Sequence, residues 1–252
     1  MTVTVTELFR HPIKSHGREK MDAVTLFEGA TMPGDRVWAV ANQMAKIGPD
    51  ATGWAVCGNF SRGSKCPGLM ALNARLDDAA GTVTLSHFAL GEITVDPDDA
   101  TDARRLVDWT VPLMEGSGLT SEFIVRAPGR GMTDSDYPSI SINSHNSLRA
   151  LSDAVGEALS PLRWRGNIWV EAEGPWQEFE WVGKTIRLGE AELAVREPIV
   201  RCPATMANPE TGARDVDTLK ALRTGWDHQD FGVYAEVVKG GRVSTGDTVQ
   251  VL

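Results

Sequence analysis

The 252-residue sequence contains only three cysteines and two tyrosines, and it has no long apolar run. Cys57, Cys66 and Cys202 form no CxxC pair and no zinc-ligand spacing with the five histidines, which disfavours a disulfide scaffold and a zinc module. No stretch reaches the roughly 18 apolar residues that a membrane helix requires, and no basic-then-apolar leader opens the chain. We therefore expect a cytoplasmic protein with reduced thiols and no membrane partner.

Positive charge is also scarce, because 25 Lys and Arg stand against 34 Asp and Glu, giving a net charge of −9. Nucleic-acid binding needs a basic face, so nucleic acid is not expected as a partner. The content of 42% hydrophobic and 23% charged residues is typical of a folded globular protein.

Sequence motifs of several common enzyme classes are missing. The chain has no GxxxxGK[ST], no GxGxxG between a strand and a helix, no GxSxG and no HExxH. Any chemistry must therefore be assembled from smaller signals.

Short alternating runs bounded by Gly, Pro, Asp or Asn dominate the chain, and they are typical of strands joined by tight turns. Strands are expected at Val3–Phe9, Val37–Asn42, Gly81–His87, Glu92–Val95, Glu122–Val125, Ser139–Ile142, Asn167–Glu171, Thr185–Leu188, Glu192–Val195, Val233–Val238 and Thr248–Leu252. Because the strands outnumber the helices without regular β-α alternation, we predict a strand-rich α+β fold built on a barrel or a curved sheet.

Three segments have helical signals. Asp96–Trp109 offers Asp96 as an N-cap, and Ser144–Leu159 offers Ser144 as an N-cap with an apolar stripe that ends at Leu159. Asp217–Arg223 is a shorter candidate. The span Ala127–Pro138, rich in Gly, Pro and Asp, is the candidate linker or active loop.

Two polar pairs lie beside early strands. Lys14-Ser15 can hold a phosphate through ammonium and hydroxyl donors, and the alternative is an ordinary solvated turn. Asp35-Arg36 enters an apolar strand and is a second candidate for a chemical role. The alternative is an ordinary ion pair that closes a turn.

Two further signals lie in the second half of the chain. Arg163 and Arg165 alternate with Trp164 ahead of Asn167, which predicts an anion-binding fork or arginines stacked on aromatic rings. Arg201 precedes Cys202 and is expected to lower the pKa of that thiol, which favours metal ligation or nucleophilic attack. The alternative is a small buried cysteine.

Together with Phe231-Gly232-Val233-Tyr234 and Gly246-Asp247-Thr248-Val249, these signals resemble in their order the MOSC family. The family is named after the C-terminal part of molybdenum-cofactor sulfurase. The resemblance implies an N-terminal β-barrel-like region at 1–126 and a MOSC domain at 127–252, similar to the amidoxime-reducing proteins. The run Ser61–Pro67 differs in spacing from the Thr-x-Arg-x-x-Pro run of those proteins, where Arg62 would be the arginine.

The resemblance implies a pterin-based molybdenum cofactor, molybdenum–molybdopterin, and no pyridoxal phosphate. Its anionic parts, its pterin and its metal need cations, amide-type groups and a soft ligand respectively. The residues that the resemblance assigns to cofactor binding are Lys14, Ser15, Arg36, Arg165, Asn167, Arg201, Cys202 and Tyr234. Cys202 is the implied thiolate ligand of molybdenum and the catalytic residue.

Two functions remain open from the sequence. The first is a molybdenum-dependent reductase of N-hydroxylated small molecules, which takes electrons from a separate ferredoxin-like or haem protein because three cysteines cannot complete an iron–sulfur site. The second is a carrier of the cofactor, or of sulfur as a persulfide on Cys202.

Overall fold

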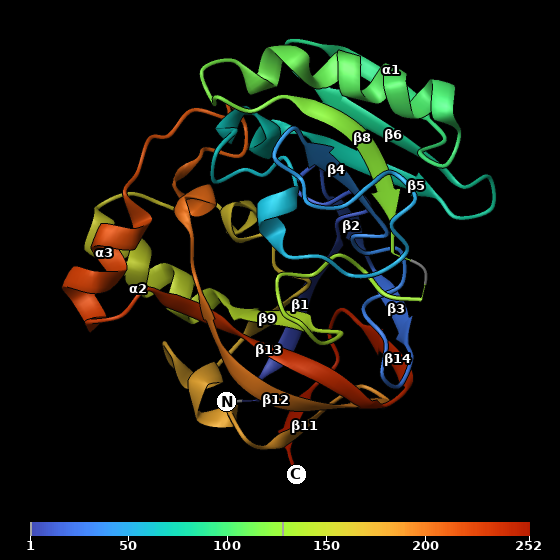
Figure 1. Cartoon of the computed structure of the whole chain (residues 1–252). Coiled ribbons are helices and arrows are strands. Elements are labelled where there is room, and N and C mark those ends of the chain that lie inside the picture. The colour runs from blue at the N-terminus through green and yellow to red at the C-terminus, as the bar shows by residue number, and fades with distance from the viewer. Residues whose placement is uncertain (1, 128) are drawn as a thin grey trace.

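The computed structural model describes residues 2–127 and 129–252 (Figure 1). Its largest element is a sheet of eight strands: β1 (Thr4–Arg10), β2 (Glu19–Met21), β9 (Ile140–Ser144), β10 (Ile168–Glu171), β11 (Thr185–Leu188), β12 (Ala191–Val200), β13 (Asp230–Lys239) and β15 (Val249–Val251). The strand order is β15-β11-β12-β13-β9-β10-β1-β2, and only the β9–β10 pair among these is parallel.

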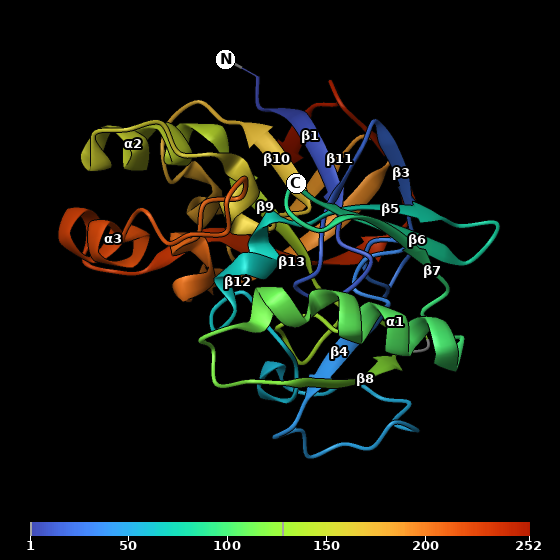
Figure 2. The ribbon, with the colours of Figure 1, turned by 90° about the horizontal axis from the view of Figure 1, so that it is seen from above.

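Smaller elements surround this sheet. The remaining strands are β3 (Ala23–Leu26), paired with β14 (Gly241–Ser244), β4 (Trp38–Asn42), paired with β8 (Ser121–Arg126), and the three-stranded sheet of β5 (Asn73–Asp77), β6 (Thr82–His87) and β7 (Gly91–Val95). The helices are α1 (Ala100–Thr110), α2 (His145–Val155) and α3 (Thr218–Trp226). Figure 2 shows α1 beside β8 and the three-stranded sheet, while α2 and α3 lie together at the other side of the molecule.

The large sheet is curved and buries both faces. The β12–β13 register shifts at three places, and such bulges bend and twist a strand pair. On β10, Ile168 and Val170 join the core on one face, whereas Trp169 joins a second cluster that includes apolar residues of α2 and α3. The predicted strand-rich α+β fold with a curved sheet is confirmed.

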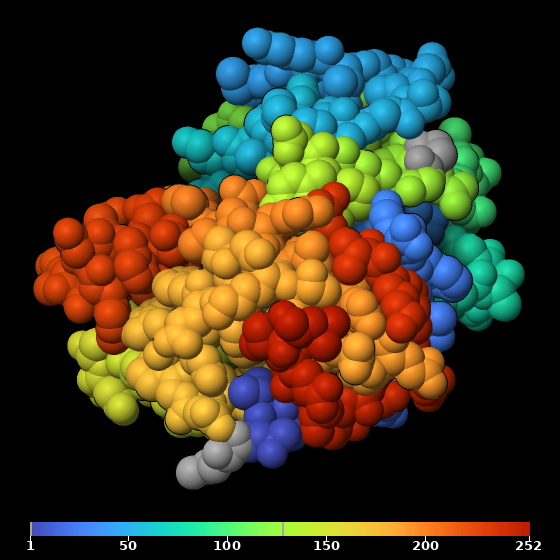
Figure 3. Space-filling view, turned by 90° about the horizontal axis from the view of Figure 1, so that it is seen from below, coloured from blue at the N-terminus to red at the C-terminus, as the bar shows by residue number. Residues whose placement is uncertain are grey.

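Strands from the two ends of the sequence share one sheet. β1 pairs with β10, and the hydroxyl of Thr6 donates to the carbonyl of Trp169 at 3.0 Å. Figure 3 shows the blue N-terminal segment enclosed by atoms from the last third of the chain. The domain boundary at residue 126 stays a prediction, and it does not coincide with a boundary between sheets, since β1, β2 and β3 pair with strands beyond it or with one another.

Every predicted strand is present. Most begin and end within a few residues of the predicted bounds, and β12 and β13 are longer than predicted. Four further strands were not predicted: β2, β3, β5 and β14. The missed strands are short or carry polar residues at several positions, so they lack a clear period of two. The loop prediction for 127–138 holds for the described residues, and Pro128 lies outside them.

The helix boundaries needed correction. Asp99, and not Asp96, caps α1, because its carboxylate accepts the amide hydrogens of Thr101 and Asp102. Ser144 caps α2 as predicted, but α2 ends at Gly156, whose φ of 87° is left-handed, so Leu159 lies outside the helix. Asp217 caps α3. In the part of the chain that the structure describes, no helix combines the length and the apolar character needed to cross a bilayer.

Glu178 gives the first testable prediction. Its carboxyl is fully buried, lies 2.8 and 2.9 Å from the hydroxyl of Ser147 on α2, and has its pKa raised by burial from 4.5 to about 7. The folded protein thus holds this proton more tightly than the unfolded chain, so the contribution of Glu178 to stability falls as pH rises from about 4.5 to about 7. Glu178→Gln should therefore be more stable than the wild type at pH 8, by about 1–3 kcal/mol.

Urea unfolding of both proteins at pH 5 and pH 8 measures this difference. The variant's advantage should shrink at pH 5, where the wild-type carboxyl is protonated. A difference that does not change between the two pH values would contradict the assignment.

Candidate functional site

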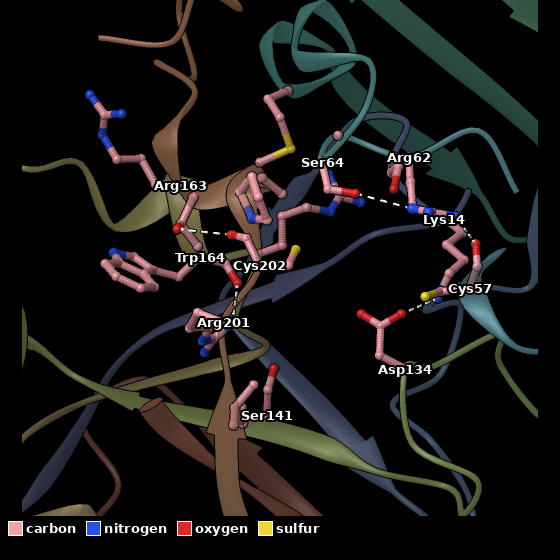
Figure 4. A pocket seen from close by; sticks show the side chains of 18 of the residues that line it. Lys14, Cys57, Arg62, Ser64, Asp134, Ser141, Arg163, Trp164, Arg201 and Cys202 are labelled. Carbon is pink, nitrogen blue, oxygen red and sulfur yellow. Dashed lines mark hydrogen bonds and ion pairs between the residues drawn. The ribbon is translucent and has the colours of Figure 1, made fainter. Parts of the chain in front are cut away.

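A cavity of about 520 Å³ lies where loops of the N-terminal half meet the edge of the large sheet (Figure 4). Pockets that hold small molecules and cofactors commonly have this size. The lining residues are Lys14, Ser15, Arg36, Cys57, Arg62, Gly63, Ser64, Lys65, Met70, Asp134, Ser141, Arg163, Trp164, Arg165, Ile199, Val200, Arg201, Cys202, Pro203, Ala204, Thr205 and Tyr234. Of the predicted site residues, all except Asn167 line this cavity, while their roles in binding stay predictions.

Left-handed backbone is concentrated at this cavity. Five described non-glycine residues have a positive φ, and three of them line the cavity: Ser15 at 64°, Arg36 at 52° and Arg165 at 48°. Such conformations are unfavourable for residues with a side chain, and they persist where the surrounding structure enforces them, often at functional sites. Ser15, Arg36 and Arg165 thus lie in three separate turns, and all three line the same cavity.

Arg165 has hydrogen-bonding capacity to spare. Its Nη1 donates to the carbonyl of Gly17 at 3.0 Å, whereas its buried Nη2 has no partner among residues 2–127 and 129–252. Burial, together with the charge of Arg36, lowers the pKa of Arg165 to about 9, so the group is still a cation at neutral pH. An unpartnered buried donor with a positive charge is a strong indication of an anion site.

Lys14 is held by a carboxylate that the sequence did not single out. Its Nζ donates to the carbonyl of Met132 at 2.7 Å and to Asp134 at 2.6 Å. Asp134 lies in the predicted active loop, and the charges of Lys14, Arg36 and Arg165 keep its pKa low although burial opposes them. The loop therefore brings a carboxylate into a space whose other charged lining residues are Lys and Arg.

Arg36 forms the ion pair that was the alternative for its motif, and its role in binding stays a prediction. It forms an ion pair with Asp35, whose carboxylate also accepts the backbone amide of His11 at 2.7 Å, and it lines the cavity. Burial of Asp35 would raise its pKa, but Arg36 and His11 hold it well below its usual range. Asp35 thereby fixes the position of the Arg36 guanidinium.

Arg163 does not form the predicted anion-binding fork with Arg165. Its Nη1 and Nη2 bind the two carboxylate oxygens of Asp215 at 2.7 and 2.8 Å. The stacking expected for this motif occurs instead at Arg201, whose guanidinium lies 5.5 Å from the ring of Trp164. Of the two arginines in this motif, Arg165 is the one that remains available for a ligand.

Arg201 is held within the protein. Its guanidinium donates to the carbonyl of Phe231 at 2.7 Å, to the carbonyl of Trp164 at 2.9 Å and to Oδ1 of Asn143 at 2.8 Å. Asn143 fits between two glycines, and a Cβ on Gly232 would lie 1.9 Å from its Oδ1. Arg201 therefore joins three segments that form the site, although it was predicted to bind the cofactor.

The charge of Arg201 lowers the pKa of Cys202 as expected, but the expected net result is wrong. The thiol of Cys202 opens to the cavity, and yet the surrounding protein desolvates its charged form, so its pKa is raised above the usual value. The physical reason is that this desolvation outweighs the attraction of the guanidinium, and the charge of Asp134 adds to it. Cys202 is therefore a protonated thiol near neutral pH.

Asn167 and Tyr234 occupy different positions relative to the cavity. Asn167 lies behind the wall, where its Oδ1 accepts the hydroxyl of Ser141 at 2.9 Å and its Nδ2 donates to the carbonyl of Phe9 at 3.2 Å. It borders a neighbouring space of only about 10 Å³. Tyr234 lines both spaces, and burial and Asp134 raise its pKa to about 12, so its hydroxyl remains a donor.

No sequence motif pointed to Cys57, which is an exposed thiol on the cavity wall. Arg62 also lines the cavity, and it donates to the carbonyl of Cys57 at 3.0 Å and to Ser64 at 3.1 Å. Within the described ranges, no group of three or more His, Cys, Asp or Glu side chains could hold a metal ion.

Comparison with known proteins defines the class. Residues 131–250 match the MOSC domain family. The chain is 25% identical over 178 residues to the molybdenum cofactor sulfurase of Anopheles gambiae, a match that covers 62% of this chain and 22% of that protein. The chain thus spans about a fifth of the length of that curated relative.

Two solved structures are also similar to this chain, one over its whole length and one over less than half of it. YuaD of Bacillus subtilis aligns over 100% of this chain and 96% of its own, with a TM-score of 0.47 and 14% identity. YiiM of Geobacillus stearothermophilus aligns over 45% of this chain and 53% of its own, with a TM-score of 0.35 and 16% identity.

Residues 131–250 of the chain therefore match a MOSC domain. This domain supplies Arg165, Arg201, Cys202 and Tyr234, whereas Lys14, Ser15 and Arg36 come from the preceding half of the chain. The MOSC match and the similarity to a protein named molybdenum cofactor sulfurase are the two findings that connect this chain with the molybdenum cofactor.

The second prediction separates a structural arginine from a ligand-binding one. Arg201→Ala leaves three acceptors without their donor and should lower the free energy of unfolding by about 3 kcal/mol or more. Arg165→Ala removes the hydrogen bond to the carbonyl of Gly17 and an unpartnered buried donor, so the loss of unfolding free energy should stay within about 1 kcal/mol. Urea unfolding of the two variants tests this, and equal losses would refute it.

Proposed function

We propose that the protein binds the pterin-based molybdenum cofactor in the 520 Å³ cavity and reduces N-hydroxylated small molecules there, in the cytoplasm. The observation that carries the proposal is the presence, in one cavity, of a buried cation with one unpartnered donor, Nη2 of Arg165, and an accessible thiol at Cys202. An anionic ligand that ends in a soft metal needs both groups.

The residues present fit such a ligand. Arg165 has a free donor for an anionic oxygen, and Lys14, Ser15 and Arg36 lie around the same space. Tyr234 can donate a hydrogen bond to a heterocycle, and Cys202 offers sulfur to a metal that already prefers sulfur ligands. The cofactor, when bound, supplies the two-electron reduction, and the protein supplies binding and orientation.

Cys202 must lose its proton to act as a ligand. Because burial raises the pKa of this thiol, a bound cation has to displace the proton, and binding should release it. Asp134 keeps a negative charge near the same space and is held by Lys14. An anion that reaches Lys14 therefore competes with Asp134, while Arg165 has no such competitor among its hydrogen bonds.

The wall beside Cys202 suits an organic substrate. Ile199, Val200, Pro203 and Ala204 surround Cys202 in sequence and line the cavity, and Val200 is 68% exposed. Apolar side chains here can bury the carbon part of a substrate next to the sulfur. The electrons come, in this proposal, from a separate ferredoxin-like or haem protein, because the chain has three cysteines and not the four of an iron–sulfur site.

A second candidate function is a carrier of the cofactor or of sulfur. The similarity to a protein named molybdenum cofactor sulfurase favours it, and so does a cysteine that stays protonated until a partner activates it. In this case Cys202 bears a persulfide or holds the cofactor for transfer.

The third prediction concerns cofactor content. Protein purified from a host that makes the cofactor should contain about one molybdenum per chain and a pterin that fluoresces after oxidation. Arg165→Ala removes a charge-assisted hydrogen bond of about 1.5–3 kcal/mol, so retention on dialysis should fall about ten- to a hundredfold. Elemental analysis of wild type and variant measures both, and folded wild type without molybdenum or pterin would refute the proposal.

The fourth prediction decides between the two functions. Cys202→Ser replaces a soft sulfur by a harder oxygen that stays protonated near neutral pH, so reduction of an N-hydroxylated substrate by an artificial donor should be lost. Cys66→Ala is the matched control, because Cys66 is fully buried away from the cavity lining and its loss should leave turnover in place.

Turnover that survives in Cys202→Ser would exclude an essential thiolate. A wild type that shows no turnover but transfers cofactor or sulfur to an acceptor enzyme, with transfer abolished in Cys202→Ser, would establish the carrier function instead.

A further inference from the structure

The cavity is strongly cationic although the chain is acidic overall. Seven of the eight charged residues that line it are Lys or Arg, and the eighth is Asp134. The whole chain, in contrast, has a net charge of −9. A cleft lined by charges of one sign concentrates ligands of the opposite sign, so this cavity is suited to anionic ligands.

Most of these cations are already engaged. Three of the seven form ion pairs with carboxylates of the protein: Lys14 with Asp134, Arg36 with Asp35 and Arg163 with Asp215. Arg201 is held by three neutral acceptors, and the proposed function assigns Arg165 to an anionic part of the cofactor. Arg62 and Lys65 are the two lining cations left without a role.

Arg62 is oriented by the protein but not neutralised by it. Its Nε donates to the hydroxyl of Ser64 at 3.1 Å and its Nη1 donates to the carbonyl of Cys57 at 3.0 Å. Among residues 2–127 and 129–252, its Nη2 has no acceptor, and neither Arg62 nor Lys65 has a carboxylate partner. Arg62 is half-buried and Lys65 is exposed, so the pair lies where the cavity opens to solvent.

The turn that carries both cations packs against the segment that follows Cys202. A Cβ on Gly63 would lie 3.5 Å from the Cβ of Ala204, which is two residues after Cys202 and also lines the cavity. This distance is that of direct van der Waals contact. The turn between Arg62 and Lys65 is therefore a neighbour of the thiol-bearing segment.

A hydrogen bond fixes the same turn to the second half of the chain. Nη2 of Arg214 donates to the carbonyl of Ser64 at 2.7 Å. Figure 4 shows Ser64 and Arg62 on one side of Cys202 and Trp164 on the other. The cations of the turn thus form a wall of the cavity that is distinct from the wall at Trp164.

We propose that Arg62 and Lys65 bind a carboxylate group of the substrate, so that the substrates are N-hydroxylated compounds with an acidic group. Nη2 of Arg62 donates to a carboxylate oxygen, and Lys65 adds a second positive charge at the opening of the cavity. The carbon part of the substrate lies against Ala204 and reaches toward Cys202. The reduction of this substrate rests on the proposed function, whereas the binding of the carboxylate does not.

Titration calorimetry with two matched probes tests the proposal on the full-length protein. One probe is a benzamidoxime with a carboxylate on its ring, and the other has a neutral carboxamide in its place. The wild type should bind the carboxylate about tenfold more tightly, because a hydrogen bond to a charged group is stronger than one to a neutral group. This preference should shrink as salt is raised, since the site lies at an exposed edge.

Variants assign the preference to the two side chains. Lys65→Gln removes an exposed charge without disturbing packing and should reduce the preference by about two- to fivefold. The double variant Arg62→Gln with Lys65→Gln should bind both probes equally, and glutamine keeps a hydrogen-bond donor for the turn. Lys184→Gln is the matched control, because Lys184 is an exposed cation outside the cavity lining, and it should retain the full preference.

Equal binding of the two probes by the wild type would overturn the proposal, and so would a preference that survives in the double variant. A preference that disappears in Arg165→Ala would place the carboxylate at Arg165 instead. Loss of molybdenum from Arg62→Gln would place Arg62 in the cofactor site, which also overturns the proposal.

The proposed function can fail separately, because these titrations do not depend on turnover. Protein that prefers the carboxylate probe through Arg62 and Lys65 but never retains molybdenum or reduces either probe would refute the proposed function alone. Reduction of both probes with the same KM and the same affinity would refute the carboxylate site alone.

Discussion

The guanidinium of Arg201 connects the carbonyl of Phe231, the carbonyl of Trp164 and the side chain of Asn143, which belong to three separate segments. Trp164 and Phe231 stack with ring centroids 3.8 Å apart beside it, so the charge is covered by aromatic surface. A buried cation in such a position needs all of its acceptors, and those acceptors come together only when β9, β13 and the turn at Trp164 are in register. The placement of Cys202, the next residue, depends on this contact.

The remaining polar groups are arranged around the same point by similar means. Asp35 fixes Arg36, and Gly17 offers a carbonyl to Arg165, so two turns from the first 36 residues contribute directly to a site that also includes residues of the MOSC domain. The left-handed turns at Ser15, Arg36 and Arg165 are unfavourable locally, and the contacts that enforce them are spread over both halves of the chain. The site is therefore a property of the whole chain and not of one motif.

Much of the fold could be predicted from the sequence, because alternation and turn residues are local signals. The period of two in Thr185–Leu188 and the N-cap at Ser144 are examples that the structure reproduces. The partner of each strand could not be predicted, since no local signal tells that β1 lies between β10 and β2. For the site, residue types near turns identified most of the polar wall. The burial of Cys202 and the position of Cys57 on the cavity wall are tertiary facts, and they explain why the pKa of Cys202 is raised and why Cys57 was missed.

The position of β1 in the large sheet has a consequence for how the protein reaches its native state. Thr6 and Trp169 are 163 residues apart in sequence, so the first strand leaves the ribosome long before the strand that it must join. Until then its edge is unpaired, and loop-closure entropy opposes the pairing, which is typical of slowly folding topologies. Conversely, a chain that began at residue 131 would expose the edge of β10 that β1 covers, and exposed sheet edges promote association between chains. The first strand thus protects the sheet from self-association as well as carrying the loop with Lys14 and Ser15.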